Sequence, residues 1–372
     1  MWIEIEKDIF ESADFKGLNY ILQLLTWYPT TSVPRYNLFI HYEKLEQLEN
    51  YIKLSDIDKK IIETEFDAAI TSGITNGKYI VTNADTLENT FNIEEAILFL
   101  NQPVYIVIEN SLNDSYFLNS IFYHFDQKID GDKRRLVEFV KNNWIQFVNA
   151  GGWTNIRNYI KGQLKTYDHL ASINQKNNFQ YLRCFVMMDS DKEYASQVIQ
   201  DKEDLKVELE RQRINVHILK KRAMENYMPD KVINNLPTSK TSFRKFSSWV
   251  AVYNNLTPEQ KDHLNYKSGF PKKKVQRLFR KKGKEVEETI HINKERIEQS
   301  PQIQALYSLP ELSDTDYETI DNGLKLPKFK DYFPTLFENN YLVHKTSLLQ
   351  REGGTLVDNE FLEILQKIQD LI

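Results

Sequence analysis

Two aspartates, Asp189 and Asp191, are the residues of this 372-residue chain whose type and spacing most directly indicate chemistry. They follow the apolar run 182–188 and are separated only by Ser190. In an extended segment, side chains at positions i and i+2 lie on the same face, so both carboxylates would point the same way. Two like charges that close repel each other unless a cation or protons lie between them. The pair therefore predicts a divalent-metal site. A solvated turn with capping side chains is the competing interpretation.

The elements that must position these aspartates form an alternating pattern of apolar strands and helices between residues 101 and 232. Consecutive strands joined by helices call for a parallel sheet with right-handed crossovers. The carboxyl ends of such strands meet at one edge of the sheet, where open α/β sheets bind their ligands. Four strands are expected, at residues 103–108, 144–149, 182–188 and 214–219. The charged segment 202–212, between the last two strands, is expected to form an exposed helix because its charges alternate in sign.

Each of the other three strands also ends in residues suited to such a site. Glu109 follows the first strand and is a candidate metal ligand or general acid or base, with a solvent-exposed strand end as the alternative. Gly151 and Gly152 follow the second strand, where they either let the backbone approach a metal or phosphate or form an ordinary turn. Lys220 and Lys221 follow the fourth strand and are candidates to stabilise a pentacovalent phosphate. Adjacent strand residues point to opposite faces, so the sequence does not decide which lysine faces the site.

The types and order of these residues resemble the TOPRIM fold, which topoisomerases, bacterial primases and a class of nucleases share. The TOPRIM pattern has a glutamate after the first strand, a glycine turn after the second and Asp-x-Asp after the third. The segment 219–229, in which lysines precede Glu225, Asn226 and Tyr227, resembles the nuclease part of OLD-family (overcoming lysogenization defect) phage-defence proteins. The resemblance covers about residues 101–232.

The resemblance implies an α/β fold of the TOPRIM type, a Rossmann-like parallel sheet with flanking helices. It also implies a metal-dependent endonuclease that uses Mg²⁺, or Mn²⁺ in its place, to cleave DNA or RNA. Glu193 would join the metal through a water, and Glu225 would reach the metal or pair with Arg222. The candidate residues are Glu109, Asp189, Asp191, Lys220 and Lys221 for catalysis, Glu109, Asp189, Asp191 and Glu193 for the metal, and Asp114, Gly151, Gly152, Arg222, Glu225 and Asn226 for support.

The chain departs from the family pattern in three places. Asn110 stands where glycine is usual, and Asn113 stands where an acidic residue is expected, with Asp114 next to it. The long interval between Glu109 and Asp189 implies an insertion near 126–143. The sequence also contains no Gly-x-x-x-x-Gly-Lys-Ser/Thr motif, which an ATP-binding P-loop needs. We therefore expect a separately encoded ATPase of the ABC or SMC type as partner in an antiviral defence system.

The regions that flank the expected catalytic domain, residues 1–100 and 233–372, are predicted to be mostly helical. The stretch 266–284 contains seven lysines and two arginines but no acidic residue. Aromatic residues are interleaved with these cations, a pattern that favours contact with nucleic acid, although a solvated basic face is the alternative. The candidates for this contact are Lys272, Lys273, Lys274, Arg277, Arg280 and Lys281.

Composition excludes several classes of protein. Cys184 is the only cysteine, which excludes an internal disulfide framework and fits a reducing cytosol. The net charge of -5 argues against a uniformly basic nucleic-acid binder. No apolar run approaches the roughly 20 residues of a membrane helix. We therefore expect a cytoplasmic protein with no membrane partner.

Two other functions stay open from the sequence. A topoisomerase or primase would use the same TOPRIM residues, although the chain lacks zinc-binding cysteines of the primase kind. A nucleic-acid-binding module that no longer cuts is the third interpretation, which Asn110 and Asn113 favour. The sequence does not distinguish DNA from RNA as substrate, and it does not indicate the oligomeric state.

Overall fold

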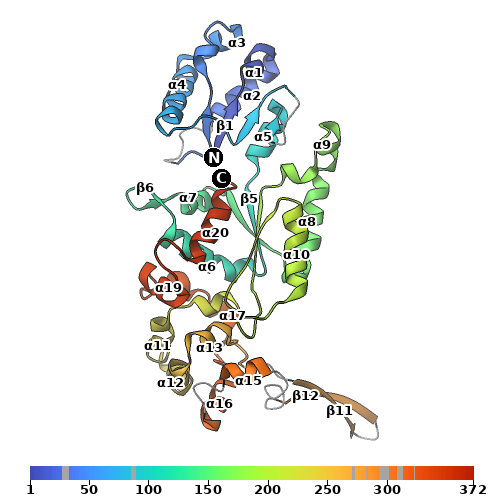
Figure 1. Ribbon diagram of the computed structural model, residues 1–372, viewed down its shortest axis with the longest axis vertical. Helices are drawn as coiled ribbons and strands as arrows, with labels where there is room; N and C mark the ends of the chain where they lie inside the picture. The colour runs from blue at the N-terminus through green and yellow to red at the C-terminus, as the bar shows by residue number, and fades with distance from the viewer. Residues whose placement is uncertain are drawn as a thin grey trace.

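The computed structural model describes residues 1–26, 33–84, 89–269, 273–281, 284–292, 301–307, 313–321 and 323–372. Its centre is a four-stranded parallel sheet with the strand order β10–β9–β5–β8 (Figure 1). The strands are β5 (Val104–Ile108), β8 (Ile145–Asn149), β9 (Cys184–Met188) and β10 (Asn215–Ile218). They coincide with the four predicted strands, so the prediction of a parallel α/β core is confirmed.

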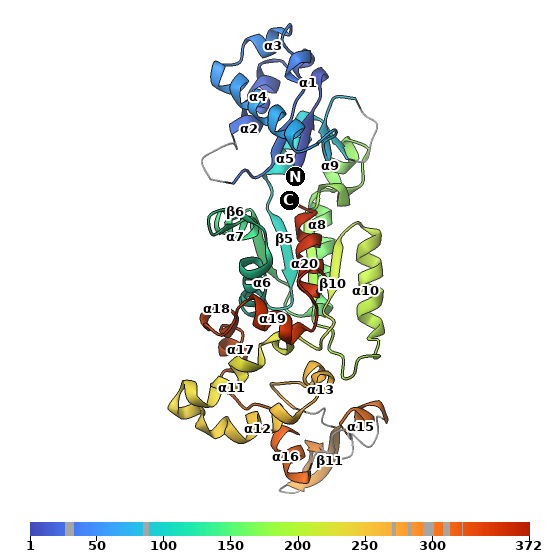
Figure 2. The same ribbon diagram turned by 60° about the vertical axis from the view of Figure 1, so that its left-hand side comes forward.

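Helices cover both faces of the central sheet (Figures 1 and 2). Because the side chains of a strand alternate between its two faces, each strand contributes to two buried layers. Ile106 and Phe185 are buried on one face, and Val107 and Val186 are buried on the other. The first face is covered by α6 (Ser111–Phe125), α7 (Arg135–Lys141) and the C-terminal helix α20 (Glu360–Gln369), and the second by α8 (Trp153–Thr166) and α10 (Gln200–Arg211).

Short elements fill the loops of the central unit. Residues 126–143, which the family resemblance marks as an insertion, contain the hairpin of β6 (Lys128–Asp130) and β7 (Lys133–Arg134), followed by α7. Helix α9 (Asp168–Ile173) and the 3₁₀ turn η2 (Asn178–Tyr181) precede β9. The 3₁₀ turn η3 (Met224–Tyr227) follows β10 and holds the Glu-Asn-Tyr segment.

The N-terminal region contains a second parallel sheet, so the prediction of a helical region at 1–100 is wrong in part. The strand order of this sheet is β2–β1–β3–β4. Its strands are only two to four residues long, too short for the alternating pattern that identifies a strand in sequence. They are β1 (Trp2–Ile5), β2 (Asn37–Phe39), β3 (Tyr79–Val81) and β4 (Thr90–Phe91), and they alternate with α1 (Lys7–Ser12), α2 (Phe15–Thr26), η1 (Tyr42–Lys44), α3 (Glu49–Ile52), α4 (Asp56–Thr71) and α5 (Ile93–Asn101).

The C-terminal region is largely helical, as predicted, apart from an antiparallel hairpin of β11 (Lys273–Lys281) and β12 (Lys284–Ile292). The buried core on the α6 face of the central sheet continues through this region to Ile372. The region therefore packs together with the central sheet, and α20 lies beside it (Figure 2). Its helices are α11 (Asp230–Ser239), η4 (Thr241–Phe246), α12 (Ser247–Asn255), α13 (Pro258–His263), α15 (Pro301–Tyr307), α16 (Asp314–Asp321), α17 (Phe329–Tyr332), α18 (Leu336–Asn339), α19 (Lys345–Glu352) and α20. None of the helices in the described part of the chain is long and apolar enough to cross a membrane.

Candidate active site

Glu109 and Asp189 leave the carboxyl ends of the two central strands, β5 and β9, which pair with each other. Both strands are apolar and mostly buried, so Glu109 and Asp189 are the first polar residues at their carboxyl ends. Burial is the main cause that raises the pKa of Glu109 above its usual range, and the charge of Asp191 adds to it. The pKa of Asp189 is raised well above its usual range by burial and then by nearby carboxylates. The predicted meeting of these strand ends is therefore present in the structure.

Two further carboxylates, Asp114 and Glu225, belong to the same electrostatic cluster. Asp114 lies in the first turn of α6, where its Oδ2 accepts a hydrogen bond from the Asn110 backbone N–H at 2.9 Å. Burial raises the pKa of Asp114 to about 7, and the charges of Glu225 and Glu109 contribute to this rise. Burial also raises the pKa of Glu225, with a smaller contribution from Asp191. Asp114 thus supplies an acidic group near the position that Asn113 leaves neutral in the sequence.

The Asp-Ser-Asp loop is fastened to the segment that follows β10. The Ser190 hydroxyl is buried and donates to the Lys221 carbonyl at 2.7 Å, and the Asp191 N–H donates to the Arg222 carbonyl at 2.8 Å. Asp191 has a φ of 55°, a left-handed conformation that Asp tolerates better than most residues. Met224 N–H donates to Asp189 Oδ1 at 3.2 Å. The loop is therefore held by its own side chains and backbone against the backbone of residues 221–224, and part of the Asp191 carboxylate stays exposed.

Lys202 is a member of the site that the sequence analysis missed. Its Nζ donates to Asp191 Oδ2 at 2.5 Å and to the Asp189 carbonyl at 2.7 Å, and it lies 3.6 Å from Glu109 Oε1. The prediction that residues 202–212 form a charged, exposed helix is wrong at this residue, which is 1% exposed. A signal was present, because Lys202 shares the helical spacing i, i+3, i+7 with the buried Leu205 and Leu209.

The glycine turn after β8 adjoins Glu109. Gly151 and Gly152 have φ values of 73° and 111°, which favour glycine. The Gly152 N–H donates to the Glu109 carbonyl at 3.2 Å, and the Gly151 N–H donates to Asn149 Oδ1 at 2.8 Å. The turn therefore lies beside the acidic site, as the strand order predicts, and it supports the backbone of Glu109 directly.

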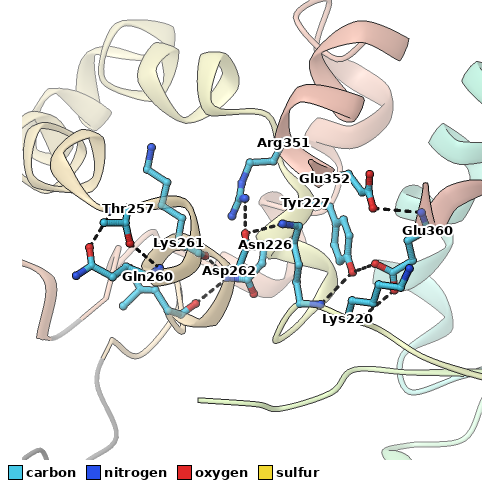
Figure 3. Close-up of polar contacts among 12 residues, drawn as sticks. Lys220, Asn226, Tyr227, Thr257, Gln260, Lys261, Asp262, Arg351, Glu352 and Glu360 are labelled. Carbon is cyan, nitrogen blue, oxygen red and sulfur yellow. Dashed lines mark hydrogen bonds and ion pairs between the residues drawn. The ribbon is translucent and has the colours of Figure 1, made fainter. Parts of the chain in front are cut away.

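The two candidate lysines after β10 pair with carboxylates of the C-terminal region. Lys220 is exposed, and its Nζ lies 2.5 Å from Glu363 Oε1 on α20. Lys221 is buried, and its Nζ lies 2.6 Å from Asp262 Oδ1 on α13. Asp262 also receives the guanidinium of Arg351 (Figure 3). The structure thus gives both ammonium groups partners other than Glu109, Asp189 and Asp191.

The other residues of the Glu-Asn-Tyr segment connect elements. The Asn226 side-chain amide donates to the carbonyls of Lys261 and Leu264, at 2.8 and 2.9 Å, and so fastens η3 to the end of α13 (Figure 3). The Tyr227 hydroxyl donates to Glu360 Oε2 and accepts from the Lys221 N–H at 3.1 Å. Glu225 is the residue of this segment that belongs to the acidic cluster, because its charge helps to raise the pKa of Asp189 and the charge of Asp191 helps to raise its own pKa.

Arg222 and Glu193 lie on a neighbouring part of the site. The Arg222 guanidinium reaches the carbonyls of Lys192 and His263, at 3.4 and 3.5 Å. Glu193 lines a narrow cavity together with Arg222 and His263. Of the two alternatives for Glu225, the ion pair with Arg222 is not among the contacts of the described residues, where Arg222 instead reaches these carbonyls.

The predicted nucleic-acid contacts fall on the β11–β12 hairpin. Lys273, Lys274, Arg277, Arg280 and Lys281 belong to β11, and Lys272 lies outside the described residues. In the pairing register Arg277 is opposite Glu288, and Arg280 is opposite Glu285. The basic strand is therefore paired with a strand that carries acidic residues. That pairing was not visible from the composition of 266–284.

The acidic cluster fits a hard divalent cation in its chemistry. Glu109 Oε1 is buried and has no hydrogen-bond partner, and such an oxygen is a suitable ligand for Mg²⁺. Across the described ranges, no three His, Cys, Asp or Glu side chains lie close enough together to hold a metal ion as they stand. The cation that contacts Asp191 in the structure is the Lys202 ammonium. Metal binding would therefore require the carboxylates and Lys202 to adjust.

Comparisons with models of known protein families, with curated proteins and with solved structures each find no match. The structure itself defines the class of protein: an α/β protein with parallel sheets and flanking helices. Its acidic side chains gather at the carboxyl edge of the central sheet, which is the edge where open α/β sheets bind ligands.

Proposed function

We propose that this chain is a Mg²⁺-dependent nuclease of the TOPRIM type that hydrolyses phosphodiester bonds of DNA or RNA. The observation that carries the proposal is the convergence of carboxylates from separate segments: the ends of β5 and β9, the first turn of α6, and η3. Each of these carboxylates has a raised pKa, and neighbouring negative charges contribute to every shift. A cluster of this kind is stabilised by protons or by a cation, and a divalent ion meets that need.

The acidic residues would have different roles. Glu109, Asp189 and Asp191 would hold the ion, with Glu193 assisting through a water. When bound, the ion would neutralise charge on the phosphate and lower the pKa of a bound water. Asp114 would support these ligands, because its carboxylate accepts a hydrogen bond from the Asn110 N–H directly after Glu109 and lies buried near Glu109 and Glu225. The sequence candidates Lys220 and Lys221 take no part in this assignment, since each is paired with a C-terminal carboxylate.

The proposal extends to partners through the sequence resemblance. The polymer would be a nucleic acid, contacted in part by the basic strand β11. The OLD-family resemblance and the missing P-loop motif support an ABC- or SMC-type ATPase as partner in an antiviral defence system. The substrate polymer, DNA or RNA, is left to the cleavage assay.

A second function is favoured by Lys202. Its ammonium already neutralises part of the acidic cluster, so the fold does not need a metal to keep these carboxylates together. A TOPRIM-like module that binds nucleic acid without cutting it would show this arrangement. Both functions predict an intact fold, and they differ in metal binding and cleavage.

The cleavage assay uses the purified chain, alone and with any ABC- or SMC-type ATPase that a neighbouring gene encodes, on single-stranded DNA, duplex DNA and RNA. Each substrate is incubated with Mg²⁺ or Mn²⁺ and, separately, with a chelator. We expect metal-dependent cleavage that E109Q and D189N abolish, while the matched variant D201N, which changes an exposed carboxylate on α10, keeps it. Full metal-dependent cutting by E109Q or D189N would refute the site.

Two other outcomes of the same assay identify the alternatives. Relaxation of supercoiled plasmid without net breaks would favour a topoisomerase. Binding of nucleic acid with no cleavage under any metal condition, together with no stabilisation by either metal, would favour the non-cutting module.

A further inference from the structure

Lys202 occupies an unusual position for a lysine. It lies on α10, yet it is 1% exposed and its Nζ points into the acidic site. The ring of Trp153, at the start of α8, lies beneath the ammonium with its centroid 5.5 Å from Nζ. A buried ammonium needs charge and hydrogen-bond partners, because burial of an unpaired ion is costly. The site provides both of these to Lys202.

The partners of Lys202 are the groups to which we assign the metal. Its Nζ contacts Asp191 Oδ2 at 2.5 Å and the Asp189 carbonyl at 2.7 Å. Glu109 Oε1, the oxygen without a hydrogen-bond partner, lies 3.6 Å away. The lysine therefore links the loops that follow the two central strands, and it places one positive charge where the carboxylates would otherwise repel one another.

We propose that Lys202 is a built-in counter-cation that competes with the divalent ion for the carboxylates and so sets the metal affinity of the site. This inference rests on the proposed metal-dependent function. In the metal-free protein the ammonium keeps Asp191 and Glu109 from repelling each other. A divalent ion held by the same carboxylates must either displace the ammonium or bind beside it. Two cations that share these carboxylates repel each other. Lys202 thus weakens metal binding while it stabilises the metal-free site.

The test measures the Kd for Mn²⁺ of the full-length, metal-stripped chain by calorimetric titration. K202M removes the charge and keeps most of the side-chain length, and K202Q retains a hydrogen-bond donor if K202M fails to fold. The matched control is K206M, which changes a lysine one turn further along α10 that is less deeply buried. We expect both Lys202 variants to bind Mn²⁺ at least tenfold more tightly than the wild-type chain, a change of about 1.4 kcal/mol. K206M is expected to stay within about twofold.

A second readout separates charge from size. K202R keeps the positive charge, so its Kd is expected to remain within about threefold of the wild-type value. In the absence of metal, K202M is expected to unfold at a lower temperature than K206M, and saturating Mn²⁺ is expected to narrow that difference, because the tighter binding adds about 1.4 kcal/mol to the stability of K202M. A purely structural lysine would lower the unfolding temperature of K202M without changing its Kd.

The outcomes distinguish this inference from the proposed function. Equal Kd values in the wild-type chain and in K202M, or weaker binding by K202M, would overturn the role of Lys202 and leave the metal site standing. Absence of Mn²⁺ binding in all variants would overturn the metal site itself, and with it the inference.

Discussion

The ion pair between Lys221 and Asp262 gives a sharp prediction about a residue that sequence alone places in catalysis. The Lys221 ammonium is buried and lies 2.6 Å from Asp262 Oδ1, which is also bound by Arg351. Removing one partner of a buried pair costs about 3–5 kcal/mol when the other charge is left uncompensated. Because Arg351 still compensates Asp262 in K221M, we expect a smaller loss of unfolding free energy, about 2 kcal/mol, near the value of a hydrogen bond to a charged group.

A double-mutant cycle isolates this interaction. D262N leaves two buried cations facing a neutral amide, so we expect it to cost more than K221M, about 3–4 kcal/mol. K221M/D262N should cost less than the sum of the single changes, with a coupling of about 1–2 kcal/mol. Urea unfolding, monitored by tryptophan fluorescence and circular dichroism, measures the unfolding free energy of all three variants. The matched control is K220M, whose exposed pair with Glu363 should contribute less than about 1 kcal/mol.

The same variants also decide how Lys221 acts. The structural role predicts that cleavage by K221M, assayed below its unfolding transition, falls no more than that of other variants of equal stability. Unchanged stability together with abolished cleavage would refute this reasoning and would favour a role of Lys221 in stabilising the pentacovalent phosphate.

Two further predictions concern Asp114 and the glycine turn. An unfolded Asp ionises near 3.8 and folded Asp114 at about 7, so the unfolded chain releases this proton first and stability falls by up to about 4 kcal/mol between pH 4 and pH 7. D114N lacks this fall and should be more stable than the wild-type chain at pH 8 but not at pH 4; equal urea midpoints at pH 8 would contradict the shift. G152A places a Cβ on backbone with φ 111°, and that Cβ would meet no neighbouring atom within 4 Å. We therefore expect backbone strain alone to lower the unfolding free energy, measured in urea, by about 1–3 kcal/mol. An unchanged unfolding free energy would contradict the strain.

The fold of the central unit could be predicted from sequence because its two central strands are apolar runs of five residues with clear polar ends. Val104–Ile108 and Cys184–Met188 are buried on both faces, which makes each a continuous apolar segment. The N-terminal strands could not be predicted in the same way. They have two to four residues each, and their pairing depends on contacts across the chain, such as that of Trp2 with Asn37.

The carboxylates of the site could be predicted because strand topology fixes where their backbones lie. Glu109 and Asp189 follow paired strands, and no choice of side-chain rotamer removes them from that edge. The long cations were less predictable, because a lysine side chain can turn toward any acidic group within its reach. Lys220 and Lys221 turn toward Glu363 and Asp262, far away in sequence.

Lys202 is the opposite case to Lys220 and Lys221, because its sequence position did not predict a place in the site and the structure puts it there. The alternating charges of α10 suggested a solvated helix, yet this lysine lies on the stripe of Leu205 and Leu209 and is buried with them. The burial of a charge depends on the acidic partners that other segments supply, here the loop after β9. A charged residue at an apolar helical position was the available signal.

The measurement that tests the central claim most directly is the effect of Mg²⁺ on the thermal unfolding of the wild-type chain and of D189N. Ligand that binds only the native state at 100 times its Kd stabilises it by about 2.7 kcal/mol. D189N replaces a carboxylate whose pKa is raised well above its usual range by a neutral amide of the same shape, so it should fold without metal. We predict that Mg²⁺ raises the unfolding temperature of the wild-type chain and leaves that of D189N unchanged. An equal rise in both proteins, or no rise in the wild-type chain with Mg²⁺ or Mn²⁺, would contradict the metal site.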